Sequence, residues 1–159
     1  MPKRENLATA KKLISWRVSM FSGQSIQVKA LDSGIVELTV DLKDESVNKF
    51  NAATLRELRE AMGKISSYTG LRGLLITSGK DAFIAGADIT EFMGHFKKSE
   101  EELVSWLLET NKVFSSIEDL PVPTVAALKG FALGGGFEFP LAAAYRVAAE
   151  GTKVGLPET

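Results

Sequence analysis

The sequence predicts an α/β domain in which a sheet is covered by helices. Two continuous apolar stretches, residues 71–77 and 122–128, have the pattern of buried parallel strands. Other segments carry an apolar residue at every third or fourth position, which is the spacing of an amphipathic helix. Because strand and helix patterns alternate along the chain, an α/β architecture is expected.

The first half of the chain predicts a hairpin followed by a helix. Residues 24–31 and 35–40 are the expected strands, and residues 32–34, with the sequence Asp-Ser-Gly, supply the turn between them. Asn51 is expected to cap a helix that runs to about residue 68. The apolar face of this helix consists of Leu55, Leu58, Met62 and Ile65.

Two further helices are expected between the apolar strands. Residues 83–88 show no clear periodicity, and either Asp88 or Thr90 is suited to cap a short helix that follows them. Ser99 and Glu102 have the spacing of a capping box at the start of a long helix. The apolar positions of the long helix include Leu103, Trp106, Leu107 and Phe114.

The last part of the chain predicts a glycine-rich turn after residues 122–128, then a helix, then a short strand at residues 146–148. The length of 159 residues favours one domain. Residues 1–19 carry five Lys and Arg against one acid and are expected to be an extension of unknown role, with the domain over residues 20–159. A basic organellar transit peptide is the alternative for that extension.

Composition and charge exclude several classes of protein. A formal net charge of -1 gives no electrostatic case for binding nucleic acid. The absence of cysteine removes disulfide scaffolds, thiolate zinc sites and cysteine nucleophiles. The single histidine, His95, is expected to be a surface residue, and no metal site is expected. No apolar run is long enough to span a membrane.

Three segments contain residues suited to chemistry. Glycines 134–136, between a strand and a helix, leave N–H groups at a helix start that suit an anion or a developing oxyanion, although a tight turn without a ligand explains them equally well. The small residues within 83–88 allow a ligand to lie against the backbone, but a packed turn is the commoner reason for them. Glu158, beside Pro157, is uninformative by itself.

Taken together, the three segments resemble the crotonase family of enoyl-CoA hydratases and isomerases. Residues 83–88, 134–138 and 155–158 follow the motif order of that family, and Glu138 and Glu158 have the spacing of its carboxylate pair. Residues 45–50 and 84–92 are more narrowly similar to the bacterial multifunctional fatty-acid oxidation branch of the family. The resemblance begins near Met20 and extends to the last residue.

The resemblance implies a fold and a set of site residues. The implied fold is the α/β crotonase-like (ClpP/crotonase) core, a superhelix of ββα units, here truncated and incomplete at the C-terminus. By motif position, the backbone N–H groups of Ala87 and Gly135 form the oxyanion hole for a thioester carbonyl. By the same resemblance, Glu138 is expected mainly to activate water, and Glu158 is expected mainly to exchange the Cα proton. Further substrate-binding positions are Ala85, Gly86, Asp88, Gly134 and Gly136.

The implied activity is hydration of 2-trans-enoyl-CoA in fatty-acid β-oxidation, with Δ3-Δ2-enoyl-CoA isomerase activity beside it. No cofactor is expected, because coenzyme A belongs to the substrate and NAD would serve only a downstream region that this chain lacks. The expected partners are the acyl-CoA substrate and a 3-ketoacyl-CoA thiolase beta subunit, in the bacterial cytoplasm. The alternatives are another CoA-thioester reaction (thioesterase or decarboxylase) and an inactive truncated fragment. Pro140 and Ala144 depart from the family pattern.

Overall fold

The structure is a computed structural model that describes residues 18–95 and 98–158. Most of the predicted extension, residues 1–17, lies outside the described part. The side chain of His95 also lies outside it, so the expected surface position of that side chain stays a prediction.

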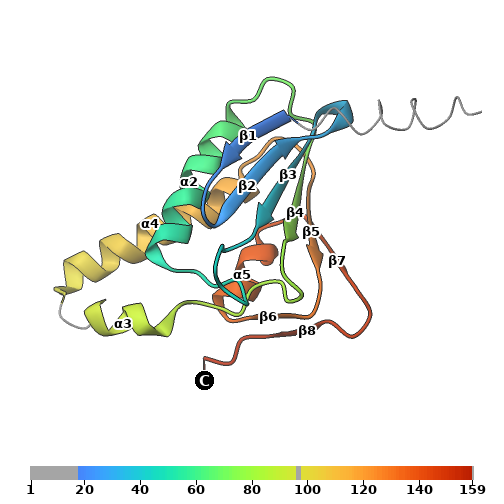
Figure 1. The fold of residues 1–159 in the computed structure, drawn as a ribbon. Coiled ribbons are helices and arrows are strands. Elements are labelled where there is room, and N and C mark those ends of the chain that lie inside the picture. The colour runs from blue at the N-terminus through green and yellow to red at the C-terminus, as the bar shows by residue number, and fades with distance from the viewer. Residues whose placement is uncertain (1–17, 96–97, 159) are drawn as a thin grey trace, which may run out of the picture.

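A six-stranded sheet forms the centre of the fold, which confirms the α/β class (Figure 1). Its strand order is β1-β2-β3-β4-β5-β7. The first three strands pair antiparallel, and β3, β4, β5 and β7 pair parallel, as the two continuous apolar stretches predicted. The strands are β1 (Val18–Ser22), β2 (Ile26–Ala30), β3 (Ile35–Val40), β4 (Gly73–Ser78), β5 (Thr124–Leu128) and β7 (Tyr145–Ala148).

The predicted hairpin is present as β2 and β3, joined by the short 3-10 turn η1 (Asp32–Gly34). Ser33 and Gly34 adopt positive φ angles of 63° and 78° there, which explains the turn-forming residues. Strand β1 was not predicted. It pairs antiparallel with β2, and its two ends are exposed, so it lacks the alternating apolar pattern that reveals a half-buried strand.

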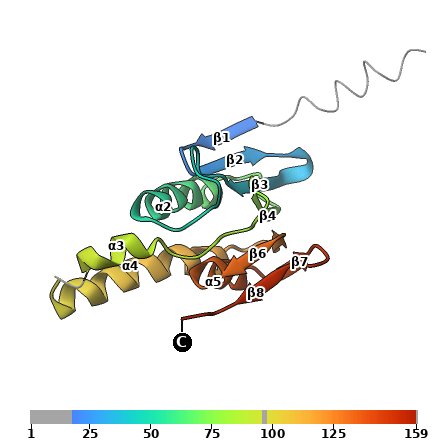
Figure 2. The same cartoon turned by 60° about the horizontal axis from the view of Figure 1, so that its bottom comes forward.

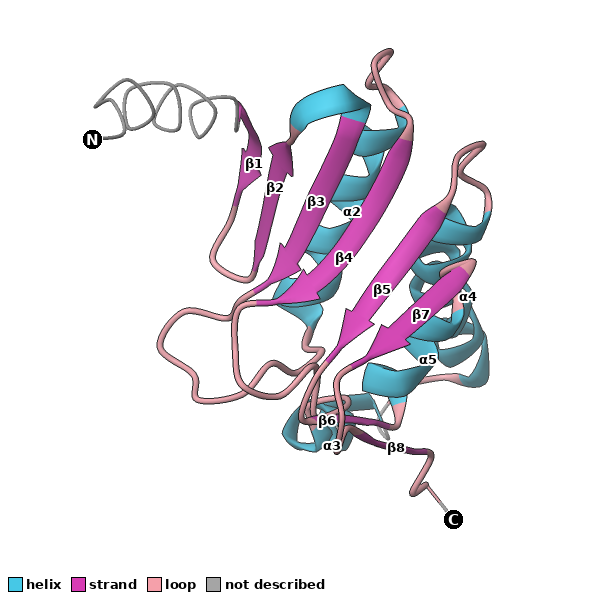
Figure 3. Ribbon diagram, turned by 90° about the vertical axis from the view of Figure 1, so that its right-hand side faces the viewer, coloured by secondary structure: helices cyan, strands magenta, loops and turns pink. Residues whose placement is uncertain are grey.

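Helices α2 (Ala52–Ser66), α4 (Glu100–Glu118) and α5 (Gly135–Leu141) lie on one face of the sheet (Figure 3). Both predicted caps are present. The Asn51 side chain accepts a hydrogen bond from the Thr54 N–H at 2.8 Å, and Ser99 and Glu102 form the reciprocal capping box. These local signals set the helix starts.

The first half of α4 projects past the sheet and runs beside the short helix α3 (Ile89–His95) (Figures 1 and 2). Leu107, expected on the apolar face, is therefore 50% exposed, whereas Val113 and Ile117 in the second half are buried. Helical spacing predicted the apolar positions, but only the packing decided which of them reach the core.

Two very short strands, β6 (Phe131–Leu133) and β8 (Lys153–Gly155), pair parallel beside α5 (Figure 2). Neither was predicted, because three residues carry too little periodicity. The hydrophobic core lies between the main sheet and the helices. Its largest fully buried side chains include Phe83, Phe139, Ile26, Leu38, Leu58, Ile65 and Ile76. No helix within the described residues is both long and apolar enough to cross a membrane.

The side chain of Glu57, in α2, stabilises the turn between β1 and β2 through hydrogen bonds. Its carboxylate accepts hydrogen bonds from the N–H groups of Gln24, Ser25 and Ile26 at 2.8–3.0 Å. Replacing Glu57 by alanine leaves these donors without their acceptor and is expected to lower the free energy of unfolding by about 1.5–3 kcal/mol. Denaturant titration measures the change. The matched control is Glu60→Ala on the exposed face of the same helix, expected to cost less than about 0.5 kcal/mol. Equal losses in the two variants would contradict this role.

The contribution of Glu57 depends on pH. Partial burial opposes the charged form, but the three backbone hydrogen bonds outweigh it and lower the pKa of Glu57 from its ordinary value of 4.5. A lowered carboxylate pKa stabilises the fold above the unfolded value, and the contribution is lost as the pH falls through the folded value. The stability difference between the wild type and Glu57→Ala is therefore expected to shrink below about pH 4.5. A constant difference down to the lowest pH at which both proteins stay folded would be the contrary result.

Candidate active site

The parallel strands β3, β4, β5 and β7 all point toward the same edge of the sheet, where β6, β8 and α3 lie (Figure 3). The segments that follow these strands are residues 41–50, 79–88, 129–138 and 149–158. Because the carboxyl ends of parallel strands share one edge, residues far apart in the sequence meet there. The three segments singled out from the sequence all belong to this edge.

A cavity of about 270 Å³ at this edge brings four predicted residues together. Ala87, Gly135, Glu138 and Glu158 all line it. The remaining lining residues are Phe50, Asn51, Ala52, Leu55, Asp88, Glu91, Trp106, Leu107, Thr110, Asn111 and Phe114. The cavity wall thus combines apolar and aromatic side chains with several polar and acidic ones.

The backbone around Ala87 is strand-like, and this sets the direction of its N–H. Phe50 donates a hydrogen bond to the Gly86 carbonyl at 2.8 Å and accepts one from the Asp88 N–H at 2.7 Å. In an extended segment successive N–H groups point to opposite sides, so the Ala87 N–H points away from Phe50. Within the described part of the chain it donates no hydrogen bond.

Gly135 is the first residue of α5, and its N–H is likewise without an acceptor among the described residues. Gly134 precedes it with φ 52° and ψ -133°, a conformation open to glycine and strained for other residues. The Gly134 N–H donates a hydrogen bond to the Gly155 carbonyl of β8 at 2.9 Å, and the Gly134 carbonyl accepts one from the Glu138 N–H at 3.0 Å. The β6–β8 pair, which was not predicted, therefore fixes the start of this helix.

Both carboxylates lie close to this glycine turn. One Glu138 oxygen is 3.7 Å from where a Cβ on Gly135 would stand, and a Cβ on Gly134 would overlap the Glu158 carboxylate. Both glutamates are exposed, and both line the cavity. Two acidic groups and two backbone N–H groups that have no acceptor among the described residues therefore border one cavity.

Three phenylalanine rings pack against one another beneath this space. Phe50, Phe114 and Phe139 have centroid separations of 5.4–5.5 Å, and Phe139 is fully buried. Phe114 belongs to α4, and it both packs against the core and lines the cavity wall. The aromatic cluster couples α4 to the turn that carries Glu138.

Of the five further substrate-binding positions, only Asp88 lines the cavity. Its carboxylate accepts hydrogen bonds from the Thr90 hydroxyl at 2.6 Å and the Thr90 N–H at 3.0 Å, so Asp88 caps α3. The Thr90 hydroxyl and the Lys49 ammonium, 3.1 Å away, hold the pKa of Asp88 below its ordinary value. The alternative between Asp88 and Thr90 as the cap is settled in favour of Asp88.

The other four positions form the backbone framework behind the cavity. The Ala85 N–H donates to the Asn48 carbonyl at 2.8 Å. Gly86, at φ 119°, lies where a Cβ would be 3.1 Å from the Leu133 carbonyl oxygen. A Cβ on Gly136 would overlap the Ile84 carbonyl oxygen. Gly134 holds the turn described above. These residues bring the two donor-bearing segments close together, and they do not face the cavity themselves.

The two departures from the family pattern are accommodated locally. Pro140 is buried near the end of α5, which stops one residue later at Leu141, and Glu138 still reaches the cavity. Arg146 donates from Nη1 to the carbonyls of Pro140 and Ala143 at 3.3 and 2.7 Å. The Ala144 N–H donates to the Thr124 hydroxyl at 2.8 Å. Arg146 thus caps the C-terminal end of α5.

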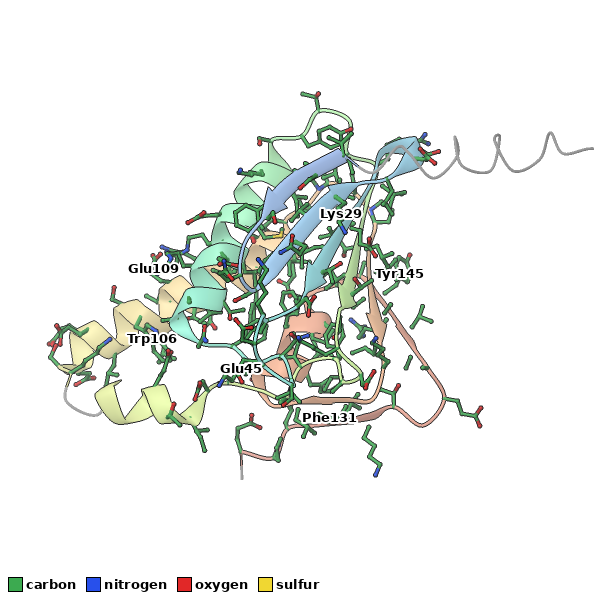
Figure 4. All side chains as sticks on the ribbon, viewed as in Figure 1. Lys29, Glu45, Trp106, Glu109, Phe131 and Tyr145 are labelled. Atoms are coloured by element: carbon green, nitrogen blue, oxygen red, sulfur yellow. The ribbon has the colours of Figure 1, made fainter. Side chains whose placement is uncertain are left out.

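Four further residues from the start of α2 and from α4 line the cavity wall and were not predicted as site residues. Asn51 and Leu55 come from the start of α2, and Thr110 and Asn111 come from α4. Trp106, labelled in Figure 4, lines the wall from the projecting half of α4. Helical periodicity shows that such residues share a face, but it does not show that the face borders a cavity.

The sequence profile of enoyl-CoA hydratase/isomerase matches residues 31–159. The chain is 58% identical over 139 residues to the fatty acid oxidation complex subunit alpha of Pseudomonas entomophila (strain L48). It is equally similar to the subunit of the same name from Pseudomonas putida (strain GB-1). Each match covers 87% of this chain and 19% of the relative, so the chain spans about a fifth of their length.

Solved structures with the same fold are also similar. An enoyl-CoA hydratase from Bacillus anthracis matches with a TM-score of 0.73 and 32% identity over 85% of this chain and 51% of that one. The enoyl-CoA hydratase structure from Geobacillus kaustophilus HTA426 matches with a TM-score of 0.78 and 26% identity over 89% and 52%. With its profile match, its α/β topology and these neighbours, the chain belongs to the enoyl-CoA hydratase/isomerase (crotonase) family.

Proposed function

We propose that this chain carries the catalytic groups for hydration of 2-trans-enoyl-CoA, with Δ3-Δ2-enoyl-CoA isomerase activity at the same site. The observation that carries the proposal is the single cavity lined by Ala87, Gly135, Glu138 and Glu158. Family membership supports the reaction class. The finer assignment rests on the arrangement of two unpaired N–H donors beside two carboxylates.

The proposed division of labour follows from the chemistry of the thioester. The N–H groups of Ala87 and Gly135 would hold the carbonyl oxygen, where negative charge develops as the Cβ–O bond forms. The Glu138 carboxylate would take one proton from the attacking water, and protonated Glu158 would deliver its proton to Cα. One water hydrogen would stay on the new hydroxyl group, and transfer of the other from Glu138 to Glu158 would restore both carboxyls to their starting states. For isomerisation, the same pair would move one proton between carbons.

The proposal also covers the substrate class, the pathway, the location and the partner of the protein. The substrate class is an acyl-CoA, with no bound cofactor. The name of the relatives, subunit alpha of a fatty acid oxidation complex, supports a place in fatty-acid oxidation. The proposal also includes a bacterial cytoplasmic location and a 3-ketoacyl-CoA thiolase beta subunit as partner. The activity of the chain on its own belongs to the same proposal.

Product analysis tests the reaction type. With crotonyl-CoA the expected product is 3-hydroxybutyryl-CoA, and a 3-enoyl-CoA is expected to yield its 2-enoyl isomer. Release of free coenzyme A without a hydroxyacyl thioester would favour a thioesterase, and release of carbon dioxide from a malonyl-type thioester would favour a decarboxylase. Failure to bind any acyl-CoA in a thermal-shift titration would favour the alternative that this chain is an inactive fragment. A non-esterified coenzyme A control separates binding of the acyl group from binding of the nucleotide.

A further inference from the structure

Asn48 is a fully buried polar residue at the carboxyl edge of the sheet, and it does not line the cavity. Its Oδ1 accepts a hydrogen bond from the Leu42 N–H at 3.0 Å. Its Nδ2 group has two hydrogens to donate and lies within hydrogen-bond distance of three acceptors: the carbonyl of Val40 at 2.8 Å, the hydroxyl of Ser78 at 2.9 Å and the carbonyl of Phe83 at 3.1 Å. One side chain therefore joins the end of β3, the end of β4 and the segment that leads to Ala87.

The main chain beside Asn48 continues the same attachment. The Asn48 carbonyl accepts from the Ala85 N–H at 2.8 Å, and the Phe50 N–H donates to the Gly86 carbonyl at 2.8 Å. Residues 48–50 thus hold residues 83–88 through one side-chain contact and a run of backbone contacts. Ala87 lies within residues 83–88, so the position of its N–H depends on the position of Asn48.

Ser78 completes the connection. Its hydroxyl donates to the Ala82 carbonyl at 2.6 Å and accepts from the Lys80 N–H at 3.1 Å, besides its contact with Asn48. Ser78 is 9% exposed. A buried network whose donors and acceptors are all paired has one geometry, and removing a member leaves partners unsatisfied.

We infer that Asn48, together with Ser78, is the positioning residue that aims the Ala87 N–H at the thioester oxygen. The inference rests on the proposed function, and it gives Asn48 no contact with the substrate. An oxyanion donor acts at about 2.7–3.1 Å from the oxygen. A misplacement of about 1 Å costs roughly 100-fold in rate. The network lies next to one of the two proposed donors and is distinct from both carboxylates.

A conjugated thioester reports the polarisation directly. Bound 2,4-hexadienoyl-CoA absorbs at longer wavelength when hydrogen bonds polarise its carbonyl, and the shift at saturation does not depend on affinity. The wild type is expected to show this red shift. Asn48→Ala and Asn48→Asp are expected to lose most of it, and Ser78→Ala to lose part. Turnover of crotonyl-CoA in Asn48→Ala is expected to fall roughly 100-fold in kcat with KM within about threefold.

The matched control is Thr124→Val, which also removes a buried hydroxyl with one hydrogen bond, here to the Ala144 N–H. It is expected to lower stability and to keep the full red shift, because Thr124 lies outside the network. A purely structural role for Asn48 would likewise lower stability and leave the shift unchanged. The shift therefore distinguishes positioning from general support of the fold.

Each outcome decides a separate question. A wild type that fails to bind the dienoyl thioester, or binds it without a shift, overturns the proposed function. A wild type with a shift and a folded Asn48→Ala with the same shift overturn the positioning inference alone. Should Asn48→Ala fail to fold, Ser78→Ala decides: a full shift overturns the inference, and a reduced shift beside an unchanged Thr124→Val supports it.

Discussion

Replacing Glu158 by glutamine is expected to lower the turnover of crotonyl-CoA by about 100-fold or more, because the amide keeps the shape of the side chain and cannot exchange the proton. The same loss is expected for Glu138→Gln, whose carboxylate would take the proton from water. Both side chains face the cavity beside the unpaired Gly135 N–H. The assay follows the loss of absorbance of the conjugated enoyl thioester.

The matched control is Glu150→Gln, in the exposed turn between β7 and β8, which is expected to leave turnover unchanged. Deuterium exchange separates the two roles. Glu158→Gln should lose exchange at Cα of the hydroxyacyl product, whereas Glu138→Gln should retain part of it. Near-normal turnover in either glutamate variant would remove that residue from the mechanism.

Replacing Gly136 by alanine is expected to lower turnover by roughly 100-fold or more, although Gly136 does not line the cavity. A Cβ there would overlap the backbone oxygen of Ile84 and stand 2.8 Å from the Ile84 carbonyl carbon. Since the obstacle is backbone, the start of α5 must move away from residues 83–88. That movement separates the N–H of Gly135 from the N–H of Ala87.

Gly63→Ala is the matched control for this change. Gly63 lies in α2, where an added Cβ meets no atom within 4 Å outside its chain neighbours and the backbone of its own helix. The substitution is therefore expected to leave turnover unchanged and to stabilise the helix by up to about 1 kcal/mol. Steady-state kinetics with crotonyl-CoA, beside thermal unfolding of both variants, provides the measurement. A folded Gly136→Ala protein with wild-type turnover would show that the two donor segments need not stay in contact.

Local features of the chain were predictable because their causes are local. The Asn51 cap, the Ser99–Glu102 capping box and the turn at residues 32–34 each depend on residues within one turn of the backbone. The two central parallel strands were visible as continuous apolar runs. The motif order around Ala87, Gly135, Glu138 and Glu158 indicated the family, and the profile match confirms it.

Non-local contacts decided the rest. Strands β1, β6 and β8 exist through their pairing partners, since their own residues carry no clear periodicity. The direction of the Ala87 N–H follows from the pairing of Ala87 with Phe50. The position of residues 83–88 depends on contacts with Asn48. Phe50 and Asn48 are both distant from Ala87 in the sequence. The wall supplied by α4 depends on how far that helix projects past the sheet. The sequence by itself therefore determined the starts of α2 and α4, the α/β fold class and the family of this protein. The tertiary structure alone decided which groups share one cavity, because a shared cavity requires contacts between segments that no local pattern records.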